Sequence, residues 1–175
     1  MSKEAVLVID MLNDFVSPDG ALYCGPSARE IIPYIKGLIK RKREEKAVII
    51  YLTDRHLPDD IEFKRFRPHC IEGTKGAEII PELTPTSQDY IVPKRRFSGF
   101  FETNLEEILK KEAIKTVHVV GVCTSICVME TVSDLCDRGY EVYVHSKGVA
   151  DFDPQAHKFA LERMEKILGA KICNG

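Results

Sequence analysis

Short, unbroken apolar runs alternate along the chain with stretches whose apolar residues recur at helical spacing. The runs are rich in Val, Ile and Leu without polar alternation, a pattern typical of strands buried on both faces of a sheet. We expect six strands, at residues 5–9, 47–52, 90–92, 116–120, 140–144 and 170–173.

Helical patterns fill most of the intervals between these strands. Thr103-Asn104-Leu105-Glu106 has the form of a capping box, Gly139 follows the apolar spacing of the third helix, and Asp153-Pro154 resembles a cap followed by a first-turn proline. We expect helices at 27–42, 103–112, 125–138 and 153–169. This alternation predicts one doubly wound α/β domain over residues 1–175, with a six-stranded, mostly parallel sheet covered by helices on both faces.

The composition limits the class of protein, the partners and the cellular compartment that we expect. The 175 residues are 44% hydrophobic and 30% charged, which indicates a globular domain with a full core. A net charge of −2 argues against nucleic acid as a partner. The first strand begins too early for a signal peptide and no apolar run reaches membrane length, so we expect a cytoplasmic protein that does not bind a membrane. Its six cysteines are then expected to stay reduced.

Reactive side chains follow four of the predicted strands at the point where each strand ends. Asp10 ends the first strand, Asp54 and His56 follow the second, Lys94 follows the third, and residues 123–127 follow the fourth. In an open α/β sheet the ligand crevice lies outside the carboxyl ends of the strands. We therefore expect these side chains to converge on one pocket.

Cys127 stands where a strand gives way to a helix, and a helix start lowers the pKa of a thiol and favours a thiolate. Asp10 can take the thiol proton and return it to a leaving amine, and the ammonium of Lys94 can stabilise the thiolate. Alone, each residue also suits an ordinary role as a turn residue, a surface lysine or a buried thiol. Together they predict a nucleophilic set, with the backbone N–H groups of Cys123 and Cys127 as an oxyanion hole.

Three segments resemble the signature segments of isochorismatase-like cysteine hydrolases, and the resemblance spans nearly the whole chain. They are Val8-Ile9-Asp10-Met11-Leu12-Asn13-Asp14-Phe15, Lys94 with Phe97-Ser98-Gly99-Phe100, and Gly121-Val122-Cys123-Thr124-Ser125-Ile126-Cys127-Val128. The resemblance implies a catalytic triad of Asp10, Lys94 and Cys127 and a cis peptide between Val122 and Cys123. It also implies a possible homo-oligomer.

The long irregular stretch 53–89 is rich in Asp, Pro, Gly and His, and long loops of this kind are commonly functional. Its residues Asp54, His56 and His69 resemble the metal site of nicotinamidases, in which the ion holds the pyridine nitrogen. Glu62 precedes His69 by seven residues, as in the Bacillus-type branch. The resemblance implies a divalent ion, with zinc expected first and iron or manganese also suited to these ligands.

Glu62 is the less secure of these ligands, because Asp59 and Asp60 are equally acidic neighbours and the loop length departs from the branch pattern. Three aromatic residues near the triad, Phe15, Phe97 and Phe100, are candidates to sandwich a flat ring. Packing in the core is the alternative role for each of them.

The combined prediction is a nicotinamidase-like amidohydrolase that converts nicotinamide and water to nicotinate and ammonia through a cysteine thioester. Two alternatives remain open. One is a related hydrolase that acts on another small-molecule amide, such as an N-carbamoyl compound or a ureide, with a vestigial metal site. The other is a non-catalytic ligand-binding or oligomeric scaffold.

Overall fold

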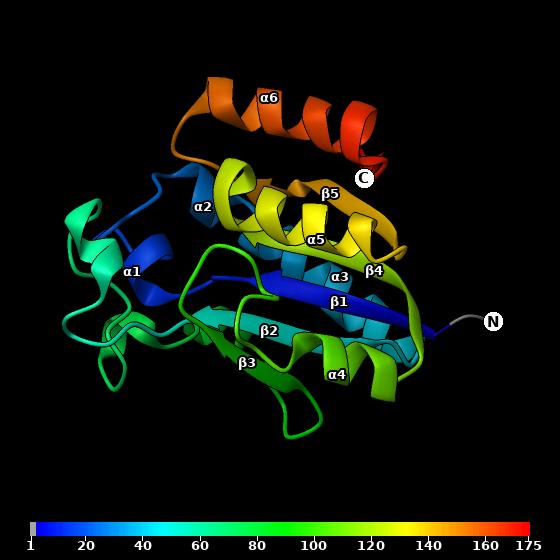
Figure 1. The fold of residues 1–175 in the computed structure, drawn as a ribbon, viewed down its shortest axis with the longest axis horizontal. Helices are drawn as coiled ribbons and strands as arrows, with labels where there is room; N and C mark the ends of the chain where they lie inside the picture. Colours follow the sequence, from blue (N-terminus) through cyan, green and yellow to red (C-terminus); the bar gives the residue numbers. More distant parts are fainter. Residues whose placement is uncertain (1–2) are drawn as a thin grey trace.

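The computed structural model describes residues 3–175 and contains a six-stranded sheet with the order β3-β2-β1-β4-β5-β6 (Figure 1). All five neighbouring strand pairs are parallel, so the predicted mostly parallel sheet is parallel throughout. All six predicted strands are present, most of them longer than expected. They are β1 (Lys3–Ile9), β2 (Val48–Asp54), β3 (Tyr90–Lys94), β4 (Ile114–Val122), β5 (Glu141–Ala150) and β6 (Lys171–Cys173).

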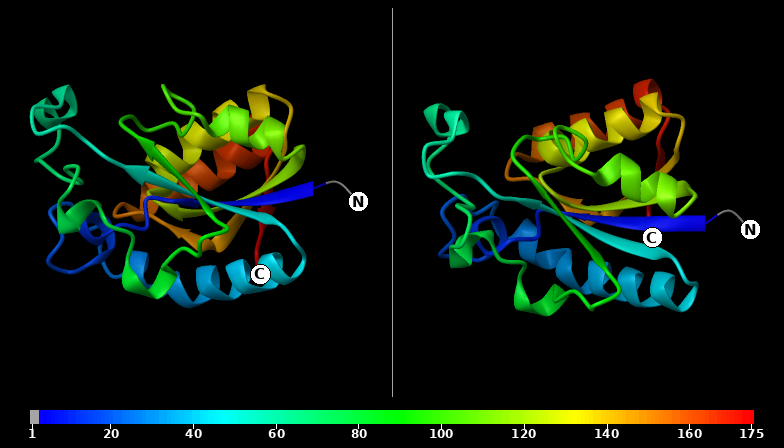
Figure 2. Two further views of the ribbon diagram at one scale, coloured as in Figure 1. Left: turned by 90° about the horizontal axis from the view of Figure 1, so that it is seen from below. Right: turned by 60° about the horizontal axis from the view of Figure 1, so that its bottom comes forward.

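Helices cover both faces of this sheet. Alternate residues of β1 show why, since Val6 and Val8 pack into the core beneath one set of helices while Leu7 packs into the core beneath the other. Figure 2 shows α3 on one side of the sheet and α4, α5 and α6 on the opposite side. The α-helices are α1 (Asn13–Val16), α2 (Ser27–Glu30), α3 (Ile32–Glu44), α4 (Leu105–Lys111), α5 (Met129–Asp137) and α6 (Pro154–Arg163).

Short helical turns complete the connections. The predicted helices at 125–138 and 153–169 each include one π turn, which opens the first helix and closes the second. The turns are η1 (Ile61–Lys64), η2 (Lys75–Ala77), η3 (Pro81–Leu83), η4 (Thr124–Val128) and η5 (Met164–Leu168). The first three lie in the long loop after β2, which therefore has local structure of its own.

Two predicted helices differ in detail from the structure, one in its continuity and one in its start. The single helix expected over 27–42 is divided at Ile31 into α2 and α3, because Pro33 has no N–H with which to continue the hydrogen-bond ladder. The helix expected from residue 103 begins at Leu105, and the Glu106 carboxylate contacts Lys110 and Arg138 rather than closing a capping box.

Other predicted helix boundaries are confirmed. Gly139 and Gly169 have φ angles of 78° and 81°, the left-handed conformation that ends a helix. The Asp153 carboxylate accepts hydrogen bonds from the N–H groups of Gln155 and Ala156 at the start of α6. Within residues 3–175 no helix combines the length and apolar character needed to cross a bilayer.

The carboxyl ends of β1, β2, β3 and β4 lie at one edge of the sheet, on the left of Figure 1, where the loop after β2 gathers. The loop is held there by backbone hydrogen bonds, including Ile80 N–H to Met11 O at 3.0 Å and Asn13 N–H to Glu78 O at 3.0 Å. The loop thus forms one wall over the strand ends that carry the reactive side chains.

Gly121 lets β4 approach β1 closely at this edge. Its φ is 120°, and a Cβ atom there would lie 2.0 Å from the carbonyl oxygen of Ile9. That neighbour is backbone, so it cannot rotate away. A side chain at position 121 would therefore push apart the two central strands next to Asp10.

We predict that Gly121→Ala destabilises the fold by about 2 kcal/mol or more, since it combines an unfavourable φ with a backbone overlap. Urea unfolding of the purified variant measures this change. Gly37→Ala on α3 is the matched control, because the added Cβ meets nothing nearer than an Arg41 side-chain nitrogen at 3.5 Å. The control is expected to be neutral or to gain up to ~1 kcal/mol. Equal stability of the two variants would contradict the argument.

Candidate active site

The structure brings Asp10, Lys94 and Cys127 together from three separate strand ends. The Nζ atom of Lys94 lies 2.9 Å from Asp10 Oδ2 and 3.4 Å from Cys127 Sγ. All three side chains are buried. A lysine with a surface role would lie in solvent, but Lys94 is only 2% exposed. Its ammonium group therefore lies in the core, between the other two side chains.

Two further acceptors complete the surroundings of the Lys94 ammonium group. It donates to Asp54 Oδ1 at 2.5 Å and to the carbonyl oxygen of Arg96 at 3.0 Å. Burial alone lowers the pKa of Lys94, but the carboxylates of Asp10 and Asp54 outweigh it and raise the pKa well above its ordinary value. Lys94 is therefore a permanent cation and not a proton donor in any neutral-pH reaction.

The same charges set the protonation of the other two members. Burial and the negative charge of Asp54 raise the pKa of Asp10 to about 6, against the opposing effect of Lys94. Burial also raises the pKa of Cys127 well above its ordinary value, and the lowering effect of Lys94 does not reverse this. The lowered thiol pKa expected from a helix start is thus wrong for this structure. A thiol at rest needs a base, and Asp10 is the carboxylate placed beside it.

The turn that carries Cys127 is fixed from two sides. The Val122–Cys123 peptide is cis, as the family resemblance implied. Asp151, at the end of β5, accepts hydrogen bonds from Ser125 N–H at 2.8 Å and Ser125 Oγ at 2.7 Å. Val128 N–H donates to Cys123 O at 3.2 Å, which makes the first turn of the helix a π turn. These bonds hold Cys127 toward Lys94.

Two other thiols, Cys24 and Cys123, line the same cavity as Cys127 but do not contact an ammonium group. Cys24 Sγ and Cys123 Sγ are 3.1 Å apart and share a hydrogen bond. That bond and burial raise the pKa of Cys123 far above its ordinary range. All six cysteines are free thiols. The thiols of Cys24, Cys70 and Cys123 contact a backbone carbonyl or another thiol, whereas the Cys127 sulfur contacts the Lys94 ammonium group.

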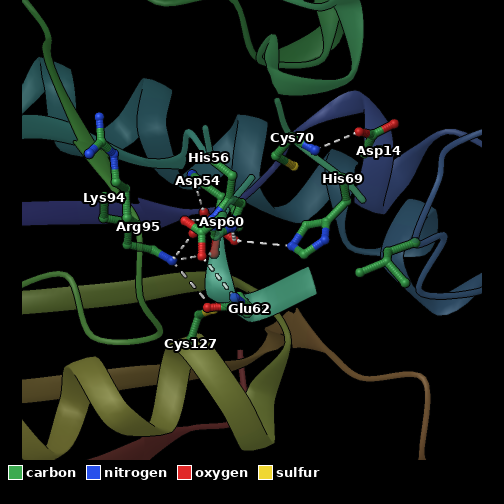
Figure 3. A network of polar contacts seen from close by, with 12 residues as sticks. Asp14, Asp54, His56, Asp60, Glu62, His69, Cys70, Lys94, Arg95 and Cys127 are labelled. Atoms are coloured by element: carbon green, nitrogen blue, oxygen red, sulfur yellow. Dashed lines mark hydrogen bonds and ion pairs between the residues drawn. The ribbon is translucent and has the colours of Figure 1, made fainter. Parts of the chain in front are cut away.

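The predicted metal ligands also converge. One ligand atom from each of Asp54, His56 and His69 lies within 4.8 Å of the other two. Asp54 Oδ2 is 3.5 Å from His56 Nε2 and 3.9 Å from His69 Nε2. Figure 3 shows these side chains pointing toward one another from β2 and the loop that follows it.

The surroundings of this cluster fit a divalent cation. His69 Nδ1 lies 2.9 Å from the carbonyl oxygen of Arg67, and His56 Nδ1 lies 3.0 Å from the Asp60 carboxylate, so both Nε2 atoms face the centre. His56 Nε2 and Glu62 Oε2 are buried without hydrogen-bond partners. Buried polar atoms are rarely left unpaired, and a cation between these donors would satisfy both.

Glu62 is buried in η1 beside this cluster, although it is not among the three residues whose ligand atoms lie closest together. Burial and the negative charge of Asp54 raise the pKa of its carboxyl group. Of its acidic neighbours, Asp59 is exposed, and both Asp60 oxygens already have partners. Glu62 therefore stays the candidate for a fourth ligand.

A cavity of about 440 Å³ joins the two groups of residues. Its lining includes Asp10, Cys123 and Cys127 from the first group and Asp54, Glu62 and His69 from the second. Much of the remaining wall is apolar. The phenyl and phenol side chains in it are Phe15, Tyr23, Phe66, Phe97 and Phe152. This volume suits a small molecule with one flat ring.

Two of the three predicted ring-binding residues, Phe15 and Phe97, line the cavity, and the third does not. The ring of Phe100 packs instead under the guanidinium group of Arg138, at 4.3 Å, and outside the cavity lining. Sequence reasoning missed Phe66, whose ring lies 6.3 Å from that of Phe97 and 6.2 Å from that of His69. Its position between two predicted metal ligands was the available signal.

Comparison with known proteins places this geometry in a family. The isochorismatase domain model matches residues 4–174. The chain is 35% identical over 180 residues to the isochorismatase family protein PncA of Bacillus subtilis, covering 97% of this chain and 98% of the relative. The crystal structure of that nicotinamidase superposes with a TM-score of 0.93, at 34% identity and covering 98% and 99% of the two chains.

Two further solved structures are similar over 99% of both chains. One is the pyrazinamidase of Pyrococcus horikoshii in complex with zinc, with a TM-score of 0.93 and 33% identity. The other is the N-carbamoylsarcosine amidase of Thermoplasma acidophilum, with a TM-score of 0.89 and 32% identity. The fold is the α/β fold of isochorismatase-like hydrolases. The chain belongs to the isochorismatase family.

Proposed function

We propose that this protein is an amidohydrolase that converts nicotinamide to nicotinate and ammonia. The observation that carries the proposal is the position of Asp54, whose Oδ1 contacts Lys94 while its Oδ2 faces the two histidines. Members of both the triad and the metal cluster therefore line one cavity. A flat ring held at the histidine end would present a carboxamide to Cys127.

In this proposal Asp54, His56 and His69, with Glu62 as fourth ligand, hold a divalent ion. The zinc complex of the related P. horikoshii pyrazinamidase supports zinc first, and iron or manganese also suit the donor set. The bound ion supplies a Lewis acid that holds the ring nitrogen of the substrate. Phe15, Phe66 and Phe97 supply apolar walls against which the ring packs.

The reaction begins when Asp10 takes the Cys127 proton. The thiolate forms an S–C bond at the carboxamide carbon, and the carbonyl oxygen becomes an oxyanion stabilised by the N–H groups of Cys123 and Cys127. The C–N bond then breaks, and the proton held by Asp10 passes to the departing ammonia. Lys94 keeps its proton throughout and stabilises the negative charge that develops at sulfur.

The resulting thioester is hydrolysed in a second half-reaction. Asp10, now a carboxylate again, takes a proton from water as the water oxygen bonds to the acyl carbon. The C–S bond breaks, nicotinate leaves, and Cys127 recovers its proton from Asp10. One water molecule is consumed and the side chains return to their starting states.

We predict that Cys127→Ala lowers ammonia release from nicotinamide by at least ~10³-fold, because the sulfur that forms the thioester beside Asp10 and Lys94 is lost. A coupled ammonia assay measures the rate, and circular dichroism confirms the fold. Cys136→Ala on α5 is the matched control, since that half-buried thiol lies outside the cavity lining. Undiminished turnover by Cys127→Ala would end the nucleophile assignment.

We predict that the protein binds one equivalent of zinc and that His69→Ala weakens zinc binding by on the order of 100-fold, because one of few ligands is lost. Elemental analysis and titration against a chromophoric chelator measure stoichiometry and affinity. Glu72→Ala, an exposed acidic residue in the same loop, serves as the control. Chelation is also expected to reduce nicotinamide turnover reversibly. Full turnover after chelation would contradict the metal assignment.

The second candidate function is hydrolysis of another amide, such as an N-carbamoyl compound or a ureide. The similarity to the T. acidophilum N-carbamoylsarcosine amidase favours it. A panel of nicotinamide, pyrazinamide and N-carbamoyl amides, assayed with and without chelator, separates the two. Metal-independent turnover confined to the non-pyridine amides would favour this candidate. Failure of a nicotinaldehyde-type electrophile to trap Cys127 would favour a non-catalytic scaffold instead.

A further inference from the structure

Asp60 contacts two of the proposed metal ligands at once. Its Oδ2 atom lies 3.0 Å from His56 Nδ1, and its Oδ1 atom accepts a hydrogen bond from the backbone N–H of Glu62 at 2.9 Å. Its side chain is 4% exposed. Figure 3 shows Asp60 between these two residues.

We propose that Asp60 is a positioning residue for metal binding, held in place by Arg96. The inference rests on the metal site of the proposed function and adds to it two residues that touch neither metal nor substrate. Each contact of the Asp60 carboxylate fixes a different ligand, one through its ring and the other through its backbone.

The contact with His56 fixes the ring. With a carboxylate as acceptor, the imidazole proton stays on Nδ1, which leaves the lone pair of Nε2 directed at the site. His56 Nε2 is the atom that is buried without a partner. A carboxylate behind a histidine also makes the ring a stronger donor to a cation.

The contact with Glu62 fixes the turn. Asp60 is the N-cap residue of η1, and its side-chain oxygen accepts a hydrogen bond two residues along the chain. This bond fixes the backbone at Glu62 and thereby the position from which its carboxyl group reaches the cluster. Both oxygens of Asp60 are occupied by these contacts and by Arg96, so Asp60 itself is not free to act as a ligand.

Arg96 ties this assembly to the triad. Its Nη1 atom lies 3.0 Å and 3.2 Å from the two Asp60 oxygens, while its carbonyl oxygen accepts the hydrogen bond from Lys94 Nζ. The Arg96 side chain is 33% exposed, so solvent screens this ion pair and its contribution to stability by itself is small. Its effect here is geometric, because Arg96 contacts two parts of the site. Its backbone carbonyl holds the proposed catalytic lysine, and its side chain holds the metal-binding loop.

The test measures zinc affinity of the metal-free protein by competition with a chromophoric chelator. Asp60→Ala is expected to bind zinc ~10- to 100-fold more weakly, the range seen when an outer partner of a ligating histidine is removed. Asp60→Asn keeps an acceptor oxygen and is expected to lose less. The zinc affinity of Arg96→Gln should lie between those of Asp60→Asn and wild type. Arg96→Lys should bind zinc more tightly than Arg96→Gln. Asp59→Ala, which alters the exposed neighbour, is the control.

A second measurement does not depend on metal or activity. Long-range ¹H–¹⁵N spectra of the metal-free protein, recorded at alkaline pH where the ring is neutral, report the His56 tautomer. It is expected to be Nδ1–H in wild type and mixed in Asp60→Ala. Thermal unfolding checks that each variant is folded. If Asp60→Ala does not fold, the same measurements are made on Asp60→Asn.

The outcomes separate the two proposals. Wild-type protein that binds no zinc but shows the Nδ1–H tautomer would overturn the metal site and, with it, the metal-binding role of Asp60. Wild-type zinc affinity in folded Asp60→Ala and Asp60→Asn, with normal binding by wild type, would overturn the positioning inference alone. A drop confined to the Asp60 and Arg96 variants, absent in Asp59→Ala, supports it.

Discussion

The ammonium group of Lys94 sits at the centre of this edge of the molecule, in contact with Asp10, Asp54 and Cys127. Burying a cation is costly unless carboxylates and hydrogen bonds compensate it, and burying two carboxylates is costly unless a cation lies between them. Each of the three charges is therefore tolerated because of the others. Removing Lys94 would leave the carboxylates of Asp10 and Asp54 facing each other in the core. The same residue therefore matters for the stability of the fold and for the chemistry of the site.

The sheet topology makes that cluster possible. Asp54 and Lys94 are direct partners in the pairing of β2 with β3, and β1 lies next to β2. Since all the pairs are parallel, residues that end neighbouring strands meet at one edge. Gly121 brings β4 close to the end of β1 on the other side, so the turn that carries Cys127 starts within reach of Asp10. The spatial order of the strands, β3-β2-β1-β4, thus determines which of these residues lie next to one another in the site.

This explains what the sequence could predict and what it could not. Apolar runs located every strand, and strand ends located Asp10, Lys94 and Cys127, because both depend on periodicity and parallel order. The assignments of Asp54, His56 and His69 came from family resemblance. Asp60, Phe66 and the two bonds by which Asp14 holds Ala21 and Cys70 were missed, since they depend on how the loop after β2 closes over the sheet. The thiol pKa was misjudged because position at a helix start carries no information about burial.

Charge balance gives Asp54 a role in both halves of the cavity. With Asp10 and Asp54 ionised and Lys94 protonated, the buried group carries a net charge of −1, and a thiolate at Cys127 would make it −2 unless Asp10 took up the proton. Proton transfer within the pair avoids that cost, which is why a base in direct reach matters more here than a low thiol pKa. A divalent cation opposite Asp54 Oδ2 would offset the remaining negative charge.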